Sequence, residues 1–323
     1  MARTRVYKHG RLEHENFPVA DISDHLQDPD SLVWLDLSLP DGDDLSPIVE
    51  ELNLHVLAVE DALTERQRPK VDRYEEHLFL SAFCTAVDAD NGTISLAEVS
   101  AFVTAQALVT VRKSHEFDVD QVVERWDASP DLAKSGVSFL VHGLLDYIVD
   151  SHFSAVETLD DQIEALEDLL FDERARDVQV QRRTFQLRKS LVVLRKVALP
   201  MREVVNSLMR RDLEFLDPSM TPYYQDVYDH VLRATEWTES LRDLVTTVLE
   251  TNLTIQGNRL NMIMKKLTGW AAVIAVPTAV TGFYGQNLPF PGYEHWGGFI
   301  TSSIILVTLS VGLFVMFRRN DWI

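Results

Sequence analysis

Two amides and a glycine interrupt the longest uncharged segment of this 323-residue chain. Residues 267–293 contain no Asp, Glu, Lys, Arg or His, yet Gly285, Gln286 and Asn287 lie among them. Neutral amides can hydrogen-bond the water around a cation without displacing it, and this suits Mg²⁺, which loses its water reluctantly. The motif therefore predicts a place where a hydrated cation is held. The alternative is a polar turn at a membrane interface.

A stripe of small and polar residues leads to this motif. Alternating steps of four and three residues select one face of a helix. That face carries Glu250, Thr254, Gly257, Asn261, Met264, Thr268, Ala271, Ala275, Thr278, Gly282 and Gly285. Small residues allow close helix packing. Several copies around an axis would instead line a water-filled path. The polar positions continue beyond the uncharged segment, which packing does not require, and this favours the pore.

Two uncharged runs must position the motif. Residues 267–284 and 296–317 are both long enough to cross a bilayer as helices. Basic pairs at 265–266 and 318–319 flank them, so the positive-inside rule predicts that both chain termini are cytoplasmic. The alternative, a buried helical hairpin in a soluble protein, does not account for the matched basic flanks.

The rest of the chain predicts a soluble α/β domain followed by long helices. No phosphate-binding loop, Ser/His/Asp set or metalloprotease motif is present, so an enzyme is not expected. The formal net charge of −20 disfavours nucleic acid as a partner. The single cysteine, Cys84, excludes an internal disulfide. The predicted strands are residues 31–38, 77–87 and 95–113, with a turn at 88–93, and the predicted short helices are 46–54 and 55–65.

A heptad pattern begins in the middle of the chain. Its apolar seam consists of Leu145, Val149, His152, Val156, Leu159, Ile163, Leu166 and Leu170. We interpret His152 as a seam position satisfied by a polar neighbour rather than as a metal ligand. Acidic residues up to 173 and basic residues from 182 predict an antiparallel helix pair with a turn near 171–177. Thr221 and Pro222 are expected to cap and begin a third helix, which runs directly into the first span.

The predicted fold is an α+β membrane protein. Its expected parts are a cytoplasmic α/β domain (1–135), a helical stalk (136–266), a first span (267–284), an extracellular loop (285–295), a second span (296–317) and a basic cytoplasmic tail (318–323).

Three segments carry a resemblance to a known family. "YGQN" (residues 284–287) resembles the Tyr-Gly-Met-Asn signature of the CorA-type magnesium transporters. "HVLAVEDALTERQRPKVDRYEEHLFL" (55–80) and "YYQDVYDH" (223–230) resemble two segments of the same family. The three occur in the family's order and cover almost the whole chain.

The resemblance implies a homopentamer in the cell's inner membrane, with the long helix of each subunit around the axis. It implies an amide ring at Asn287, a tight turn at Gly285, an upper pore at Thr278 and Gly282, an apolar constriction at Met264 and Leu267, a polar position at Asn261 and an acidic ring at Glu250. It further implies that Asp88 and Asp226 hold a regulatory divalent ion between neighbouring subunits.

One departure leaves the choice of metal open. Gln286 stands where the family has Met, and His295 beside Glu294 offers a softer ligand than Mg²⁺ needs. The first expectation is transport of magnesium, with cobalt or nickel as further ions. The alternatives are a zinc transporter of the same architecture and a membrane-anchored scaffold that conducts nothing.

Overall fold

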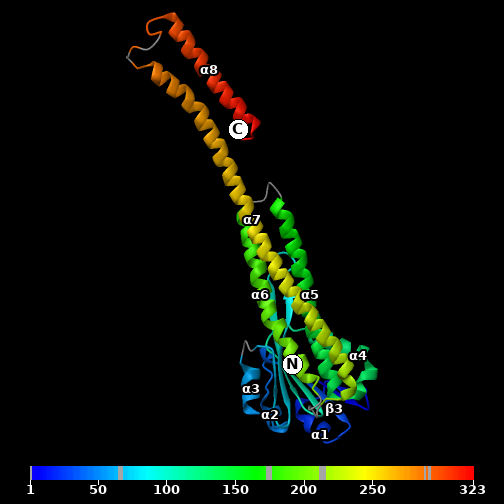
Figure 1. Cartoon of the computed structure of the whole chain (residues 1–323). Coiled ribbons are helices and arrows are strands. Elements are labelled where there is room, and N and C mark those ends of the chain that lie inside the picture. Colours follow the sequence, from blue (N-terminus) through cyan, green and yellow to red (C-terminus); the bar gives the residue numbers. More distant parts are fainter. Residues whose placement is uncertain (1, 65–67, 172–176, 211–215, 287–288, 290–291) are drawn as a thin grey trace. The chain divides into compact units, whose positions relative to one another are not determined.

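The computed structural model describes all residues except 1, 65–67, 172–176, 211–215, 287–288 and 290–291 (Figure 1). The chain forms two compact units, Met1–Val248 and Leu249–Ile323. Helix α7, Thr221–Tyr284, contributes residues to both of them, as the sequence predicted for a helix that continues into the first span.

The first unit is built on a seven-stranded mixed sheet with the order β2-β1-β3-β7-β6-β5-β4. Only the β3–β7 pair is parallel among the pairs described. The predicted strands 31–38 and 77–87 and the 88–93 turn are confirmed. The stretch 95–113, predicted as one strand, instead forms two antiparallel strands, because the chain turns at 104–106, where the Thr104 hydroxyl accepts from the Ala107 amide at 2.9 Å. The strands are β1 (Arg3–Lys8), β2 (Arg11–Glu15), β3 (Ser31–Ser38), β4 (Lys70–Arg73), β5 (Leu78–Val87), β6 (Ile94–Val103) and β7 (Ala107–Arg112).

Successive side chains of each strand point to opposite faces of this sheet, as in any β-strand. Leu80 and Trp34 face a core shared with the long helices, and Phe79 and Leu35 face a second core. Short helices cover the second face: α1 (Ile22–Leu26), α2 (Ser46–Glu51) and α3 (Val56–Leu63). Helix α4 (Val119–Ala128) packs on the first face through Trp126, which is 1% exposed.

Two long helices, α5 (Val137–Phe171) and α6 (Asp177–Leu208), confirm the predicted pair. Every position of the predicted α5 seam is buried. From Val156 onward the seam packs against Leu191 and Leu194 of α6 and against Val245 of α7, which makes a third apolar core. The residues of the predicted turn between α5 and α6 lie outside the described part of the chain from 172 to 176.

His152 on α5 provides a hydrogen-bond partner for a backbone carbonyl on the unpaired edge of β5. Strand β4 pairs with β5 only as far as Ser81, so the following β5 residues have one unpaired edge. The His152 Nε2 atom donates to the Phe83 carbonyl oxygen at 2.7 Å, and Ser151 Oγ accepts from the Thr85 amide at 3.0 Å. The interpretation of His152 as a buried seam residue with a polar partner is confirmed. Burial lowers its pKa to about 4 because the charged imidazolium loses its water.

The predicted cap of α7 was wrong. Thr221 already has helical dihedrals, and its hydroxyl donates to the Pro218 carbonyl at 2.8 Å instead of accepting an amide. The capping carboxylate belongs to Asp217, which accepts from the Ser219 amide at 2.9 Å at the start of a preceding 3₁₀ turn. Helix α7 thus begins at Thr221, one residue before the predicted Pro222, and it directly follows the 3₁₀ turn Pro218–Met220.

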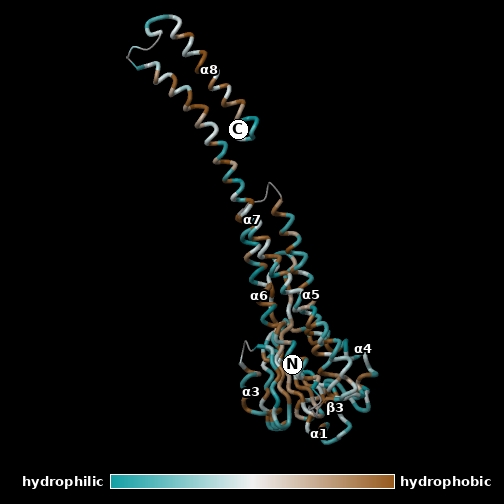
Figure 2. The backbone as a smooth tube through the Cα atoms, in the orientation of Figure 1, coloured by the Kyte–Doolittle hydropathy of each residue, from teal (hydrophilic) through white to brown (hydrophobic). Residues whose placement is uncertain are grey.

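The second unit contains the last part of α7 and helix α8, Trp296–Arg319. Both meet the length and hydropathy expected of a membrane span, and almost none of their apolar windows is buried in the protein. Figure 2 shows the hydrophobic residues along both helices. Side chains such as Ile274 (64% exposed) and Phe299 (65% exposed) would face water in a soluble protein, which excludes the buried-hairpin alternative.

Candidate ion pathway and cation sites

The polar stripe of α7 lies on the exposed side of the helix. The half-buried positions of this segment include Val273, Val276 and Val280, and the Trp270 ring lies 6.2 Å from the Phe314 ring of α8. The stripe avoids these positions. Its exposed members are Glu250, Thr254, Asn261, Met264, Thr268, Ala271, Ala275, Thr278, Gly282 and Gly285, with Gly257 half-buried. The protein therefore keeps the small and polar face free of its own second span.

Met264 is the one large apolar residue in this stripe of small and polar residues. Met264 is 58% exposed, and the neighbouring Leu267 is 63% exposed. Lys265 and Lys266 separate these two side chains in the sequence and mark the end of the uncharged segment. Both side chains are thus largely exposed, and Met264 lines a cavity together with Trp322 and Ile323 at the end of the chain.

Two threonine hydroxyls of the stripe donate their hydrogen atoms to backbone carbonyls of the helix. Thr254 Oγ1 donates to the Glu250 carbonyl at 2.9 Å, and Thr278 Oγ1 donates to the Ile274 carbonyl at 3.0 Å. Each hydroxyl proton is used inside the helix, and the oxygen lone pairs remain as acceptors. Water bound to a cation points its hydrogen atoms outward. These oxygens can therefore accept hydrogen bonds from a hydrated cation.

Gly285 ends α7 through a close backbone contact. Its amide donates to the Thr281 carbonyl at 2.8 Å. A Cβ atom at this position would lie 2.9 Å from that same oxygen, closer than real side chains approach. Glycine is thus needed here because the backbone lies too close to the Thr281 oxygen for a side chain. Its φ angle is not in the left-handed region. Gln286 follows as an exposed residue, and Asn287 lies outside the described residues.

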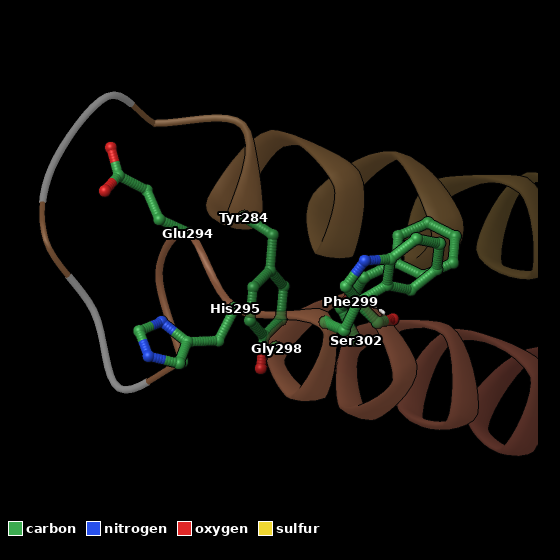
Figure 3. Close-up of a pocket in the computed structure, with 8 residues that line it drawn as sticks. Tyr284, Glu294, His295, Gly298, Phe299 and Ser302 are labelled. Atoms are coloured by element: carbon green, nitrogen blue, oxygen red, sulfur yellow. Dashed lines mark hydrogen bonds between the residues drawn. The ribbon is translucent and has the colours of Figure 1, made fainter.

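The loop after the motif packs back on the start of α8. A pocket of about 530 Å³ is lined by Tyr284, Glu294, His295 and Phe299 among others (Figure 3). The backbone of Gly292 fits against Gly298, where a Cβ atom would lie 2.3 Å from the Gly292 oxygen. Glu294 and His295 both line this pocket, and their side chains point in different directions (Figure 3).

Asp88 occupies a rigid turn between β5 and β6. Its Oδ1 accepts from the Asp90 amide at 2.8 Å, and its Oδ2 accepts from the Asn91 side chain at 2.5 Å. The turn is held by both long helices, because Gln162 of α5 donates to the Ala89 carbonyl and Ser190 of α6 donates to the Gly92 carbonyl, each at 2.6 Å. These two ties fix the position of Asp88 against α5 and α6.

Asp226 lies at the other end of α5. It is exposed on the first turns of α7. The start of α7 is fixed beside the start of α5 by the Tyr224 hydroxyl, which donates to the Ser138 carbonyl at 2.8 Å. His142 of α5 packs against Tyr224 near Asp226, whereas Gln162 of α5 contacts the Asp88 turn. The 20 residues between 142 and 162, at about 1.5 Å each, span about 30 Å. One chain does not bring Asp88 and Asp226 together.

A different cluster was not predicted from the sequence. Asp146 and Asp150 of α5 and His230 of α7 have ligand atoms within 4.8 Å of one another. The guanidinium of Arg125 on α4 already binds both carboxylates, at 2.7 Å from Asp150. The i, i+4 spacing of the two aspartates was visible in the sequence, but the approach of Arg125 and His230 depends on the fold. A side-chain cation thus occupies the cluster.

The α/β unit and the two exposed apolar helices define a class, the membrane proteins with a large soluble domain and two C-terminal spans. The model of the family described as CorA-like Mg²⁺ transporter protein matches residues 29–319. The chain belongs to this family, which consists of transporters rather than enzymes.

Individual relatives agree with this assignment. A cobalt/magnesium transport protein CorA of Thermotoga maritima is 29% identical over 96% of this chain and 90% of its own length. The zinc transport protein ZntB of Yersinia enterocolitica is 24% identical over 91% of this chain and 85% of its own length. The complete structure of the CorA magnesium transporter from Methanocaldococcus jannaschii matches with a TM-score of 0.79, at 22% identity, over 100% of this chain and 99% of that one. That structure confirms the predicted fold.

Proposed function

We propose that this chain is the subunit of a homopentameric channel that carries hydrated Mg²⁺ into the cell through the inner membrane, with both chain termini in the cytoplasm. The observation that carries the proposal is the free stripe of α7, which is turned away from α8 and presents hydroxyl oxygens as acceptors. The CorA relative of 29% identity is named for cobalt and magnesium, which supports the choice of ion.

The residues of the stripe divide the path into parts. Asn287 and Gln286, positioned by Gly285, form the outer amide ring that binds the hydration shell. Met264 and Leu267 form the apolar constriction, which closes by excluding water. The remaining positions line the path between and beyond these two: Thr278, Gly282, Ala275, Ala271, Asn261 and Glu250.

The driving force is the membrane potential. An inside-negative potential of 100 mV favours the entry of a divalent ion by roughly 4.6 kcal/mol. Neither uncharged run contains a carboxylate that would bind a bare ion in the bilayer. The stripe therefore keeps the ion hydrated, and the only desolvation needed is that of the outer water shell.

Cytoplasmic divalent ions close the channel in this proposal. Asp88 and Asp226 lie about 30 Å apart along α5 in one chain, so an ion that binds both must join two subunits. Two bare carboxylates 4 Å apart repel by about 4 kcal/mol at an effective dielectric constant of 20. A bound ion converts this repulsion into a link between subunits, and its loss loosens the closed assembly.

Uptake into proteoliposomes tests the transport. Vesicles loaded with a magnesium-sensitive dye should show Mg²⁺ entry under an inside-negative potential, and hexaamminecobalt, a mimic of hydrated magnesium, should block it. Asn287→Ala should abolish entry, whereas Asn320→Ala, beyond the end of α8, should not. Equal uptake by wild type and Asn287→Ala would exclude the amide ring, and absence of uptake by wild type would support the scaffold.

Protease protection tests the regulatory site. Mg²⁺ should protect wild-type protein, and Asp226→Lys should remove that protection. Asp229→Lys makes the same change of charge at another exposed position of α7, and protection should persist there. Mg²⁺-dependent protection of Asp226→Lys at the wild-type level would contradict the site.

Zinc is the second candidate ion. The observation that favours it is the pocket shared by Glu294 and His295, since imidazole is a better ligand for Zn²⁺ than for Mg²⁺. The same vesicles with a zinc dye and a pH dye separate the two ions. Zn²⁺ entry coupled to a pH change, with little Mg²⁺ entry and no block by hexaamminecobalt, would establish zinc.

A further inference from the structure

A basic cavity lies in the first unit, away from the ion pathway. Its volume is about 750 Å³, and it is bounded by the start of β4, the last turns of α6 and one side chain of α7. The basic residues in its lining are Arg68, Lys70, Arg202 and Arg210, and the acidic one is Glu203. A cavity with this balance is unexpected in a chain of net charge −20.

Two of these cations have no carboxylate partner among the described residues. Lys70 is paired with Asp61 at 2.6 Å and with Asp72 at 2.7 Å, so its charge is already neutralised. Arg68 and Arg202 form no ion pair within the described part of the chain, and both are exposed at the cavity. They come from separate segments of the chain, and the fold brings their two unpaired guanidinium groups to the same cavity.

The floor of the cavity is apolar. Val71 and Tyr228 are partly buried against the main core, and Pro69 and Pro200 add two rigid rings. The neutral side chains of the lining, Asn206 and Ser207, add hydrogen-bonding groups. The volume falls in the range of about 300–1,000 Å³ that small organic ligands occupy. An apolar floor beside two guanidinium groups fits a ligand with both a flat organic part and a charged part.

We propose that this cavity binds a phosphate-bearing organic anion of the size of a nucleotide. The planar guanidinium groups of Arg68 and Arg202 match phosphate oxygens in pairs of hydrogen bonds. A polyphosphate satisfies both arginines at once, whereas a single carboxylate reaches only one. The aromatic ring of Tyr228 provides the surface on which a planar base rests.

The bound anion would connect three parts of the first unit: the sheet edge at β4, the end of α6 and the start of α7. Tyr228 is two residues from Asp226 on α7. The anion would therefore stabilise the arrangement in which Asp226 is presented. The binding site does not rest on the proposed transport function, and only this regulatory consequence does.

Calorimetric titration of the full chain in detergent, without divalent ions, tests the site with ATP as the probe. Arg68→Glu/Arg202→Glu should weaken ATP binding by at least about 30-fold, because the variant loses two charged hydrogen-bonded pairs that solvent screens only in part. Arg182→Glu/Arg188→Glu is the matched control, since both residues are exposed on α6 outside the cavity and the charge change is the same. The control should change the affinity less than about 3-fold, the residual effect of screened surface charge.

Equal weakening in both double variants would overturn the proposal, because it would show attraction by overall charge alone. No saturable ATP binding by wild type would also overturn it, and Mg²⁺ uptake measured on the same preparation would show whether the transport proposal survives. Unchanged unfolding temperatures would confirm that the variants fold.

Pyrophosphate and inorganic phosphate in the same titration distinguish the organic part of the ligand from its phosphates. ATP should bind at least about tenfold more tightly than pyrophosphate, as expected for one base stacked on an aromatic ring. Tyr228→Leu, which keeps the apolar contact with the core, should remove most of this difference. Equal affinity of ATP and pyrophosphate would overturn the organic part of the proposal.

Discussion

Acid should destabilise the first unit through one buried imidazole. His152 is 1% exposed, and burial lowers its pKa to about 4, below the ordinary value of 6.5. The folded state then binds fewer protons than the unfolded state, so the stabilising effect is complete above pH 6.5 and is lost as the pH falls toward 4. At 1.36 kcal/mol for each pKa unit, the loss from this residue is about 2 kcal/mol at pH 5 and about 3 kcal/mol at pH 4.

His152→Gln isolates this contribution. Glutamine can still donate to the Phe83 carbonyl but does not titrate, so carboxylates elsewhere affect both proteins equally. Denaturant unfolding of the full chain, followed by the fluorescence of the buried Trp34 and Trp126, should give the free energy of unfolding from pH 8 to pH 4.5. Wild type should lose about 2 kcal/mol more than the variant by pH 5. Identical pH profiles for the two proteins would refute the assignment of a neutral, buried His152.

Other substitutions test the close contacts of the second unit and the occupied cation cluster. Gly285→Ala should abolish transport, because the new Cβ atom would lie 2.9 Å from the Thr281 oxygen. The control Gly312→Ala should transport normally, because its Cβ atom would meet nothing within 4 Å. Equal uptake by the two variants in vesicles would contradict this prediction. Arg125→Gln should lower the unfolding temperature and create a divalent-ion site at Asp146 and Asp150, so added Ca²⁺ should restore stability to this variant and not to wild type. An unchanged unfolding temperature would show that the arginine is not needed there.

The elements with a strong periodic signal were predictable. The heptad seam gave α5, and the uncharged runs gave α8 and the end of α7 at Tyr284. Strand β1 escaped prediction because Arg5, buried with Tyr7, interrupts the apolar pattern, and only the fold supplies its partner Asp127 at 2.8 Å. Strand β2 is exposed throughout and has no hydrophobic signal at all.

Helix α4 was missed although its signal was present. Asp118 caps it by accepting from the Asp120 amide at 3.0 Å, and Val119, Val122 and Trp126 follow at helical spacing. The acidic and polar residues between them lowered the average hydrophobicity of the segment. Here the helical spacing of the apolar residues indicated the helix better than the number of apolar residues did.

The candidate site was predictable in part. Spacing alone placed the stripe on one face, but which face α8 would cover depended on the packing of two apolar helices. The Asp146–Asp150–His230 cluster joins α5 to α7 across 80 residues of sequence, and no local pattern links them. The roles of Asn287, Asp88 and Asp226 stay predictions, since they concern an assembly of several subunits.

The turn that carries Asp88 has a consequence for how an ion could be sensed. Gln162 and Ser190 attach this turn to two long helices, and a Cβ atom on Gly92 would strike the Leu187 side chain at 2.5 Å. In the proposed regulatory site, Asp88 would therefore have a fixed position and could not move toward an ion. A carboxylate that cannot reach out binds an ion only when its counterpart arrives at the right distance. Occupancy of the proposed site would then depend on the distance between whole subunits, so that the ion would report their displacement.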